Sequence, residues 1–424
     1  MNNYFKQILY DLRHQRVVTI TSMLGTAFAI FLVMAVFTIG SIDSVPVSPE
    51  TNRPHILMGK YLHIKGDNSD SSGHLSYGTA SELYNNLNGI SKISFVSDEQ
   101  AMDASVDDGE IVSVKAISTD ETFWDIFDFK FLTGKPFDKA TVESQLKEVI
   151  LQRGTALRLF GTEDIVGREV QLNHVPYRVR GVVDNTSPLL RSTYANAYLP
   201  YAPEKPEQLW NEYCGQTATY LLTDGSVSVE DIREQVKSRY ATFTARISKQ
   251  GLEALYHQSP YTIDIAHNVW SNCDPDTTTA RNTRYIIYCI LLVLPAINIS
   301  SMTRSRLRLR VSEIGVRRAY GATKWSILGR FLTENLVLTL AGGIIGLVLC
   351  VIFVTLFSNM FISYGGIFAD ADMVNARPTI QMLLNFNTFA IALVFCLILN
   401  ILSTGMPAWR ASRVNPAEAI SGKK

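Results

Sequence analysis

Several motifs by which enzymes hold a cofactor or activate a nucleophile are missing from this 424-residue sequence. No stretch has the G-x-x-x-x-G-K-[ST] spacing that cradles nucleotide phosphates, and no G-x-S-x-G motif presents a reactive serine. Histidine is scarce, with seven residues, and none belongs to an H-E-x-x-H zinc motif. Six of the seven fall within residues 43–284 without a shared spacing, which favours scattered surface or strand histidines and no metal site. Catalysis and cofactor binding by the chain itself are therefore not expected.

Cysteine is also rare, with five residues. Cys289, Cys350 and Cys396 lie in apolar segments, where a thiol behaves as a small apolar side chain. Cys214 and Cys273 lie outside those segments, and they either remain two separate buried thiols or pair as a disulfide. The sequence leaves both alternatives open, because a disulfide requires a Cα separation below about 7 Å that sequence alone does not give.

Charged residues are absent from four segments of the chain. Residues 17–42 form a run of 26 uncharged positions and 285–303 a run of 19, and two further apolar segments lie at 336–361 and 388–406. About 20 apolar residues cross the ~30 Å hydrocarbon layer of a bilayer as a helix, so each segment is predicted to be a transmembrane helix. The first run is longer than the usual signal-peptide core of about 7–15 residues, so we expect it to be retained.

The distribution of charge predicts the orientation of these helices. Segments 1–16, 304–335 and 407–424 together hold 15 Lys and Arg against 4 Asp and Glu, whereas 41–284 holds 23 against 33. Because basic flanks stay on the cytoplasmic side, both termini and the 304–335 segment are predicted to be cytoplasmic. The long segment between the first two helices is then extracytoplasmic. Over the whole chain 39 basic and 39 acidic residues cancel, and no nucleic-acid partner is expected.

The sequence thus predicts an α-helical membrane protein with four transmembrane helices in a 1 + 3 arrangement. A large mixed α+β extracytoplasmic domain of two lobes is inserted between helices 1 and 2. The predicted segments are a cytoplasmic amphipathic helix at 1–16, transmembrane helices at 17–42, 285–303, 336–361 and 388–406, the extracytoplasmic domain at 43–284, a cytoplasmic coupling segment at 304–335, a short extracytoplasmic loop at 362–387 and a cytoplasmic tail at 407–424.

Within the extracytoplasmic domain, β-rich runs alternate with two helix signals. One helix is predicted to begin in the capping box at 79–82 and to end near Gly89, and another begins at Ser228 and reaches about Tyr240. A boundary between the two lobes is expected within 184–192 or 201–208. Strands are predicted at 110–118, 148–152, 169–172, 177–183, 195–200 and 217–223, with a turn at 173–176.

A dense basic segment separates the second and third predicted spans. The four arginines between 304 and 310 are expected to face lipid headgroups. A short helix follows, and Gly315 weakens it by about 1 kcal/mol relative to alanine, so the missing side chain indicates close approach of a partner. Arg317 and Arg318 present planar donors to carboxylates of that partner. The pair Gly321-Ala322 is predicted to end this helix before Lys324.

Small and helix-interrupting residues indicate contacts between the spans. Pro295 and Asn298 interrupt the second span, where proline kinks a helix and asparagine seeks an interhelical partner. Gly342, Gly343 and Gly346 allow close helix packing in the third span. A polar substrate path through the spans is the less favoured alternative, because they contain almost no ionisable residue.

The coupling segment closely resembles the E-I-G-x-R-R-A-x-G-A segment of FtsX/MacB-type permeases of ABC transporters. Residues 123–138, 147–161 and 166–184 also follow the order seen in MacB-like periplasmic core domains, and 407–420 is similar to the ending of the family. In such permeases the coupling segment contacts the ATPase subunit. The resemblance therefore assigns ATPase coupling to Glu313, Ile314, Gly315, Val316, Arg317, Arg318, Ala319, Gly321 and Ala322.

The resemblance implies a multi-pass permease subunit in a bacterial inner membrane, with both termini cytoplasmic and the large domain periplasmic. It implies a homodimer, or a heterodimer with a related permease, driven by a separate ATPase subunit that binds ATP and Mg²⁺. Export of an antimicrobial, peptide or similar substrate is expected, with a periplasmic membrane-fusion adaptor and a TolC-like outer-membrane channel. The alternatives are an FtsX-like regulator of a cell-wall hydrolase, a lipoprotein-releasing permease and a membrane-anchored receptor without an ATPase.

Overall fold

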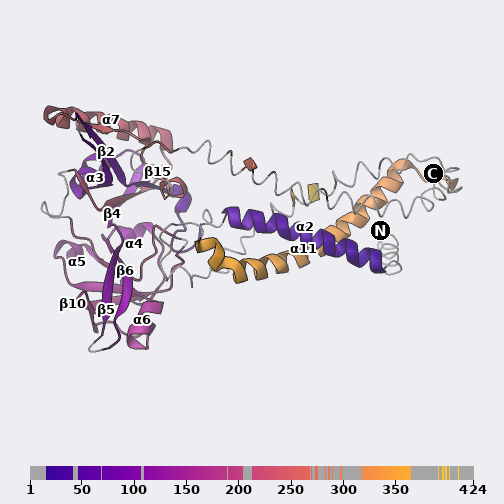
Figure 1. The fold of residues 1–424 in the computed structure, drawn as a ribbon, viewed down its shortest axis with the longest axis horizontal. Coiled ribbons are helices and arrows are strands. Elements are labelled where there is room, and N and C mark those ends of the chain that lie inside the picture. Colours follow the sequence, from indigo (N-terminus) through magenta and orange to yellow (C-terminus); the bar gives the residue numbers. More distant parts are fainter. Residues whose placement is uncertain are drawn as a thin grey trace. The chain divides into compact units, whose positions relative to one another are not determined.

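The computed structural model describes residues 16–41, 46–67, 69–106, 109–188, 190–203, 213–267 and 319–363, with isolated positions between 269 and 316 and between 390 and 409. The chain forms two compact units (Figure 1). The helical unit comprises Met1–Ile42 and Thr278–Lys424, and the sheet unit comprises Asp43–Thr277. The sheet unit occupies most of the segment 43–284 that the sequence predicts as one inserted domain.

Two long helices, α2 (Arg16–Ser41) and α11 (Lys324–Ser363), contact each other in the helical unit. Ile30, Val33 and Met34 of α2 form a buried apolar cluster with Cys350 of α11. The rings of Phe31 and Phe353 meet edge to face with centroids 5.3 Å apart, and such a pair adds to the apolar burial. This contact brings together the first and third of the predicted spans.

The predicted transmembrane helices stay predictions. Among the residues that the structure describes, no helix is both long and apolar enough to cross a membrane. The segment 17–42 lies almost wholly in α2, and α11 includes the segment 336–361. Most of 285–303 and 388–406 lies outside the described residues, as do 1–15 and 410–424.

The sheet unit is an α+β structure, as the sequence predicts. Its helices are η2 (Arg53–His55), α3 (Tyr77–Tyr84), α4 (Phe123–Ile126), α5 (Lys139–Glu143), α6 (Arg153–Phe160), α7 (Val229–Ile247), η4 (Ser248–Gln250) and α8 (Ile263–Ala266). Its strands are β1 (Ile56–Gly59), β2 (Tyr61–Gly66), β3 (Asp70–Leu75), β4 (Ile90–Ser97), β5 (Gln100–Ser105), β6 (Val112–Thr119), β7 (Phe131–Gly134), β8 (Glu148–Gln152), β9 (Glu169–Leu172), β10 (Val175–Val183), β11 (Ala197–Pro200), β12 (Cys214–Gly215), β13 (Thr217–Thr223), β14 (Leu252–Leu255) and β15 (Tyr261–Thr262).

These strands join in a 15-stranded sheet whose central path is β11-β8-β10-β9-β5-β6-β4-β13-β3-β2-β14. The first lobe contains β1–β4 and β12–β15 and buries an apolar core under α3 and α7. The second lobe contains β5–β11 and buries another core against α6. Antiparallel β4 and β6 link the lobes through the pair Val96–Thr119.

The two lobes are nested in the chain rather than consecutive. The second lobe, residues 100–200, is inserted between β4 and β13, and these two strands of the first lobe pair along their full length from Thr217–Ser97 to Thr223–Ile90. The chain therefore passes between the lobes twice, and the boundary expected within 184–192 or 201–208 accounts for only one of these passages. The other passage is the short turn between β4 and β5, and a two-residue turn carries no composition signal of a domain boundary.

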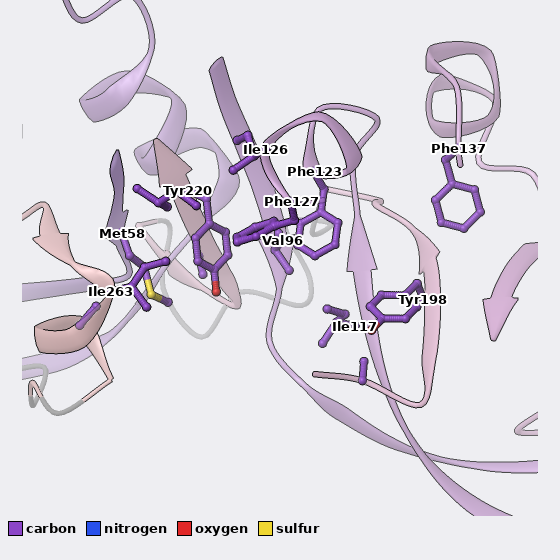
Figure 2. Close-up of a cluster of buried hydrophobic side chains, with 14 of the residues drawn as sticks. Met58, Val96, Ile117, Phe123, Ile126, Phe127, Phe137, Tyr198, Tyr220 and Ile263 are labelled. Carbon is purple, nitrogen blue, oxygen red and sulfur yellow. The ribbon is translucent and has the colours of Figure 1, made fainter. Parts of the chain in front are cut away.

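An aromatic core fills the space between the lobes (Figure 2). Phe127 lies 4.8 Å from Phe123 and 5.3 Å from Tyr220 of β13, measured between ring centroids. Tyr198 of β11 contacts the same cluster, and burial raises the pKa of both tyrosines. Since one buried cluster holds residues from both lobes, the lobes share a core instead of meeting at a linker.

Most predicted strands have close counterparts in the structure. Strands β8, β9 and β13 have the predicted bounds, and β6 and β11 begin two residues later. Strand β10 begins at Val175, because the turn uses only Asn173 and His174, with φ of 47° and 63°. Asparagine and histidine are enriched in this left-handed region, so two residues suffice for the hairpin.

The predicted start of the first helix is wrong by three residues. Ser76, rather than Thr79, is the N-cap of α3, and its hydroxyl accepts the amide of Thr79 at 3.3 Å. The Thr79 hydroxyl instead donates to the carbonyl of Tyr213, 3.0 Å away, so tertiary contact decides between two capping residues three positions apart. Ser228 caps α7 as predicted, and that helix continues beyond the expected Tyr240 to Ile247.

Candidate functional site

A turn leads into α11, and we call the described residues 316 and 319–327 the coupling elbow. The amide of Tyr320 donates to the carbonyl of Val316 at 3.1 Å, which closes a helical turn. Gly321 then takes φ of +91° and ends the turn, as the left-handed residue after a helix commonly does. The hydroxyl of Thr323 accepts the amide of Ser326 at 3.2 Å and starts α11. The predicted helix break at Gly321-Ala322 is thus confirmed.

The coupling elbow exposes large apolar side chains. Tyr320 is 88% exposed and Trp325 is 77% exposed, and Val316 is also exposed. Exposed aromatic side chains grouped at one turn are suited to a contact with another protein or with lipid. Of the predicted coupling residues the structure describes Val316, Ala319, Gly321 and Ala322, whereas Glu313, Ile314, Gly315, Arg317 and Arg318 lie outside the described residues.

Gly321→Val is expected to destabilise the elbow by about 1–2 kcal/mol. No heavy atom lies within 4 Å of a Cβ built at Gly321, so the cost arises from its left-handed φ rather than from a clash. The Tyr320 amide is then expected to exchange with solvent about 5–30 times faster. Gly321→Asn serves as the control, because asparagine tolerates this conformation. Equal exchange in the valine and asparagine variants would show that the elbow does not depend on φ at this position.

Helices α2 and α11 approach each other closely at Gly346. A Cβ built there would lie 2.9 Å from the Ala27 carbonyl oxygen and 3.1 Å from the Phe31 amide nitrogen. Gly342 and Gly343 on the same helix are buried. The structure therefore places Gly346 at a helix contact, whereas the packing role of Gly342 and Gly343 stays a prediction. Pro295 and Asn298 lie outside the described residues.

A largely buried ionic network joins segments near the first and the last residues of the sheet unit. We call it the base network. Glu50 is fully buried and its carboxylate forms an ion pair with the guanidinium of Arg53, which is 6% exposed. Arg53 Nε also donates to Asp264 Oδ1 at 2.9 Å, and the Thr193 hydroxyl donates to Glu50 Oε1 at 3.1 Å. The network thus connects the segment after α2, the loop before β11 and helix α8.

The electrostatics of the base network follow from its burial. Desolvation raises the pKa of Glu50, although Arg53 and the hydrogen bond from Thr193 oppose that shift. Nearby His267 is partly buried, and desolvation together with Arg191 lowers its pKa to about 3, so this imidazole is neutral. Opposite charges three residues apart at Glu50 and Arg53 are the one local signal of this network in the sequence; nothing in the sequence points to Asp264.

An open groove of about 440 Å³ lies on the second lobe, lined by Gly134, Lys135, Glu148, Val166, Gly167, Arg178, Val179 and Arg180. The Arg180 guanidinium is held between Asp138, at 2.6 Å, and Glu148, at 2.5 Å. A Cβ at Gly134 would lie 2.1 Å from the Arg180 carbonyl oxygen, so this glycine is needed for strand contact rather than for a ligand. The charge of Arg180 in this groove is already neutralised by the carboxylates of Asp138 and Glu148.

The histidines are less scattered than the sequence predicts. His63 Nδ1 lies 2.8 Å from His257 Nε2, so two residues 194 positions apart are direct neighbours. His74 bonds to Asp98, and His267 Nε2 lies 2.9 Å from the Ser192 hydroxyl. The prediction of scattered histidines is therefore wrong for His63 and His257, because strand pairing and the segment after β14 bring them together.

The alternative of a disulfide between Cys214 and Cys273 is not realised in the structure. Cys214 is fully buried in β12 among apolar residues of the first lobe, whereas Cys273 is exposed. They are two separate thiols, because one side chain faces the core and the other faces solvent. Only one of them matches the buried state that the sequence analysis expected.

Two family models match the chain in tandem. The MacB-like periplasmic core domain matches residues 19–239, and the FtsX-like permease C-terminal model matches residues 285–416. The first match spans α2 and most of the sheet unit. The second includes the coupling elbow and α11, so both parts of the described structure are covered.

Among curated proteins, the macrolide export ATP-binding/permease protein MacB of Acinetobacter baylyi is 22% identical over 99% of this chain and 60% of its own length. MacB of Bartonella quintana is 24% identical over 98% of this chain and 59% of its own length. The chain thus spans about 60% of the length of these relatives.

Among solved structures, the periplasmic region of MacB from Actinobacillus actinomycetemcomitans matches with 17% identity and a TM-score of 0.37 over 51% of this chain and 92% of that one. A domain of a putative permease protein from Porphyromonas gingivalis has 15% identity and a TM-score of 0.40 over 55% of this chain and 97% of that one. Since the two family models cover residues 19–239 and 285–416, the chain belongs to the FtsX/MacB-type family of ABC transporter permeases.

Proposed function

We propose that this chain is the permease subunit of an ABC transporter and that it transmits ATP-driven motion from an ATPase subunit into its sheet unit. Proteins of this family are inner-membrane proteins with a periplasmic domain. The observation that carries the proposal is the coupling elbow, whose exposed Tyr320 and Trp325 lie within the FtsX-like match, on the segment predicted to contact an ATPase. ATP and Mg²⁺ bind to the ATPase subunit in this proposal.

Contacts within each unit, together with the chain that follows α2, support a route for this motion. The coupling elbow leads directly into α11, and α11 touches the backbone of α2 at Gly346. Helix α2 precedes residues 46–55 in the chain, and these include Glu50 and Arg53 of the base network. Buried ionic and close backbone contacts resist deformation within each unit, so in this proposal a displacement of α11 moves α2 and, along the chain, residues 46–55.

The cargo and further partners follow by analogy with the relatives. These are named as macrolide export proteins that combine an ATP-binding part with a permease. We infer export of an antimicrobial, peptide or similar substrate, with a periplasmic membrane-fusion adaptor and a TolC-like outer-membrane channel. The proposed topology has four transmembrane helices and cytoplasmic termini, and the functional form is a homodimer or a heterodimer with a related permease.

Charge reversal in the coupling segment tests the proposal. In the double variant Arg317→Glu and Arg318→Glu, we expect an ATPase subunit that copurifies with the intact chain in mild detergent to be lost, because carboxylates on that subunit would meet like charges. Binding of the ATPase and ATP hydrolysis in the purified complex are the measurements. A decrease of tenfold or more in bound ATPase corresponds to about 1.4 kcal/mol or more of binding free energy.

The matched control is Arg308→Glu with Arg310→Glu, which makes the same change of charge in the same segment but outside the coupling residues. Loss of the ATPase in the first double variant and retention in the control support the proposal. Equal retention in both variants, or a wild-type complex without any P-loop protein after gentle crosslinking, would favour a membrane-anchored receptor.

A further inference from the structure

A row of four side chains crosses the edge of the first lobe, formed by Asp70, His63, His257 and Asp274. His63 Nε2 lies 2.6 Å from Asp70 Oδ1, and His257 Nδ1 lies 3.1 Å from Asp274 Oδ1. Between the rings, His63 Nδ1 and His257 Nε2 are 2.8 Å apart. The row connects β2 and β3 to the segment that follows β14.

When both imidazoles are neutral, no hydrogen atom is left for the contact between the two inner nitrogens of this row. An ionised carboxylate only accepts hydrogen bonds, so His63 Nε2 and His257 Nδ1 each carry a hydrogen. In two neutral imidazoles, His63 Nδ1 and His257 Nε2 are then both lone pairs, and they point at each other across 2.8 Å. Two facing lone pairs repel unless a positive centre lies between them. The pair therefore binds either one additional proton or another cation.

The ring geometry supports a shared positive centre. The ring centroids are 5.1 Å apart and the ring planes differ by 12°. With the nearest nitrogens at 2.8 Å, rings at this separation lie edge to edge in nearly one plane and not face to face. Each inner nitrogen thus directs its lone pair toward a common point. Within the described part of the chain, Asp70 and Asp274 form ion pairs only with these histidines.

We propose that His63 and His257 form a binding site for a single zinc ion that displaces the shared proton, with Asp70 and Asp274 holding the outer ring nitrogens. Metal-bound histidines almost always donate their other N–H to a carboxylate or carbonyl, which fixes the tautomer, and both histidines here have that partner. Imidazole nitrogen is a preferred zinc ligand. A divalent ion also balances the charge of the two carboxylates, which one proton does not.

The site needs a small opening to accept the ion. Zinc–nitrogen bonds of about 2.0–2.1 Å at a tetrahedral centre place the two nitrogens about 3.3 Å apart, so the rings must separate by about half an ångström. They must also tilt out of their common line, because the two zinc–nitrogen bonds of a tetrahedral ion meet at an angle. His63 is nearly buried, but Asp70 is 65% and Asp274 60% exposed, so the outer carboxylates are free to follow. In the described residues no three His, Cys, Asp or Glu side chains already converge on one point. Water molecules complete the zinc shell.

Zinc binding here has a structural consequence. Asp274 lies three residues before the end of the sheet unit at Thr277, and His63 lies in the interior of β2. An ion between the two histidines ties the segment near the end of the sheet unit to β2. The site is separate from the coupling elbow and from the base network, so it does not depend on the proposed transport function.

Titration of the full chain in detergent with zinc chloride tests the proposal, using tag-free protein treated with a chelator. The wild type is expected to bind zinc at one site that both His63→Gln and His257→Gln lose. Asp274→Asn changes an exposed carboxylate and is expected to weaken the affinity about 10–100-fold. His55→Gln, an exposed histidine outside the row, is the matched control and should bind like the wild type. Magnesium chloride, which prefers oxygen ligands, should not compete.

Protection of backbone amides from hydrogen exchange provides a second readout. It does not require a substitution at the buried His63. Zinc is expected to slow amide exchange in residues 257–275 of the wild type and of His55→Gln, and to do so less in Asp274→Asn at the same concentration. A wild type that binds no zinc, so that the pair holds only its proton, would overturn the proposal. Zinc binding of unchanged affinity in both histidine variants, or in Asp274→Asn, would do the same.

Discussion

Arg53→Met is expected to lower the free energy of unfolding of the sheet unit by about 3–5 kcal/mol, as removal of one partner of a buried ion pair does. Glu50 is fully buried, and without Arg53 its carboxylate keeps the hydrogen bond from Thr193 but no positive partner. Asp264 loses its contact as well. Urea unfolding of the full chain in detergent, followed by amide exchange in β1 and β13, measures the loss.

The loss in Arg53→Met is expected to depend on pH. Burial raises the pKa of Glu50 above its ordinary value of 4.5 in the folded state, and removal of Arg53 takes away an opposing charge. When the pKa of a carboxyl group is higher in the folded than in the unfolded protein, its contribution to the free energy of unfolding is fully present below the unfolded pKa. That contribution is lost as the pH rises through the folded pKa. The deficit should therefore be smallest near pH 4.5 and grow toward neutral pH.

Two further variants separate charge burial from simple loss of a side chain. Glu50→Met combined with Arg53→Met removes both charges and should recover most of the stability, because apolar replacement of a buried pair is often neutral. Arg153→Met breaks an ion pair with Glu163 in which both side chains are partly exposed, at 47% and 34%, so its cost should be about 0–1 kcal/mol. Equal costs for Arg53→Met and Arg153→Met would mean that the base network does not stabilise the unit.

The sequence predicts those parts of the fold that depend on neighbours along the chain. Strands β8, β9 and β13 are short β-branched or apolar runs bounded by turns, and their bounds agree with the prediction. The break at Gly321 follows from the conformational freedom of glycine, and φ there is +91°. Each of these features is decided within a few residues, where periodicity and turn chemistry act.

Long-range contacts are the part that the sequence does not predict. Arg53 and Asp264 are 211 positions apart, and His63 and His257 are 194 apart, yet each pair is in hydrogen-bond contact. No local spacing links Arg53 to Asp264 or His63 to His257. The pairing of β4 with β13 has the same origin, because it closes around the whole second lobe. Tertiary topology, which one sequence does not reveal, assembles both the base network and the row of histidines.

Gly346→Leu is expected to destabilise the contact between α2 and α11 by about 3 kcal/mol, the upper part of the range for overpacking. The atoms nearest to an added Cβ include the Ala27 carbonyl oxygen at 2.9 Å and the Phe31 amide nitrogen at 3.1 Å, and backbone atoms do not move aside as flexible side chains do. The helices must separate, which exposes Ile30 and Cys350 of the shared cluster. Amides of α2 should then exchange about 100-fold faster in detergent.

Gly329→Leu is the matched control for this loss, because it makes the same substitution on the same helix, where no heavy atom lies within 4 Å of an added Cβ. If the close approach at Gly346 also transmits motion, Gly346→Leu should retain the bound ATPase subunit but lose the ATP-dependent change in exchange of residues 46–55. Gly329→Leu should retain both. Exchange of α2 that is no faster in Gly346→Leu than in Gly329→Leu would mean that this contact does not hold the helices together, and the route from α11 through α2 to the base network would lose its first step.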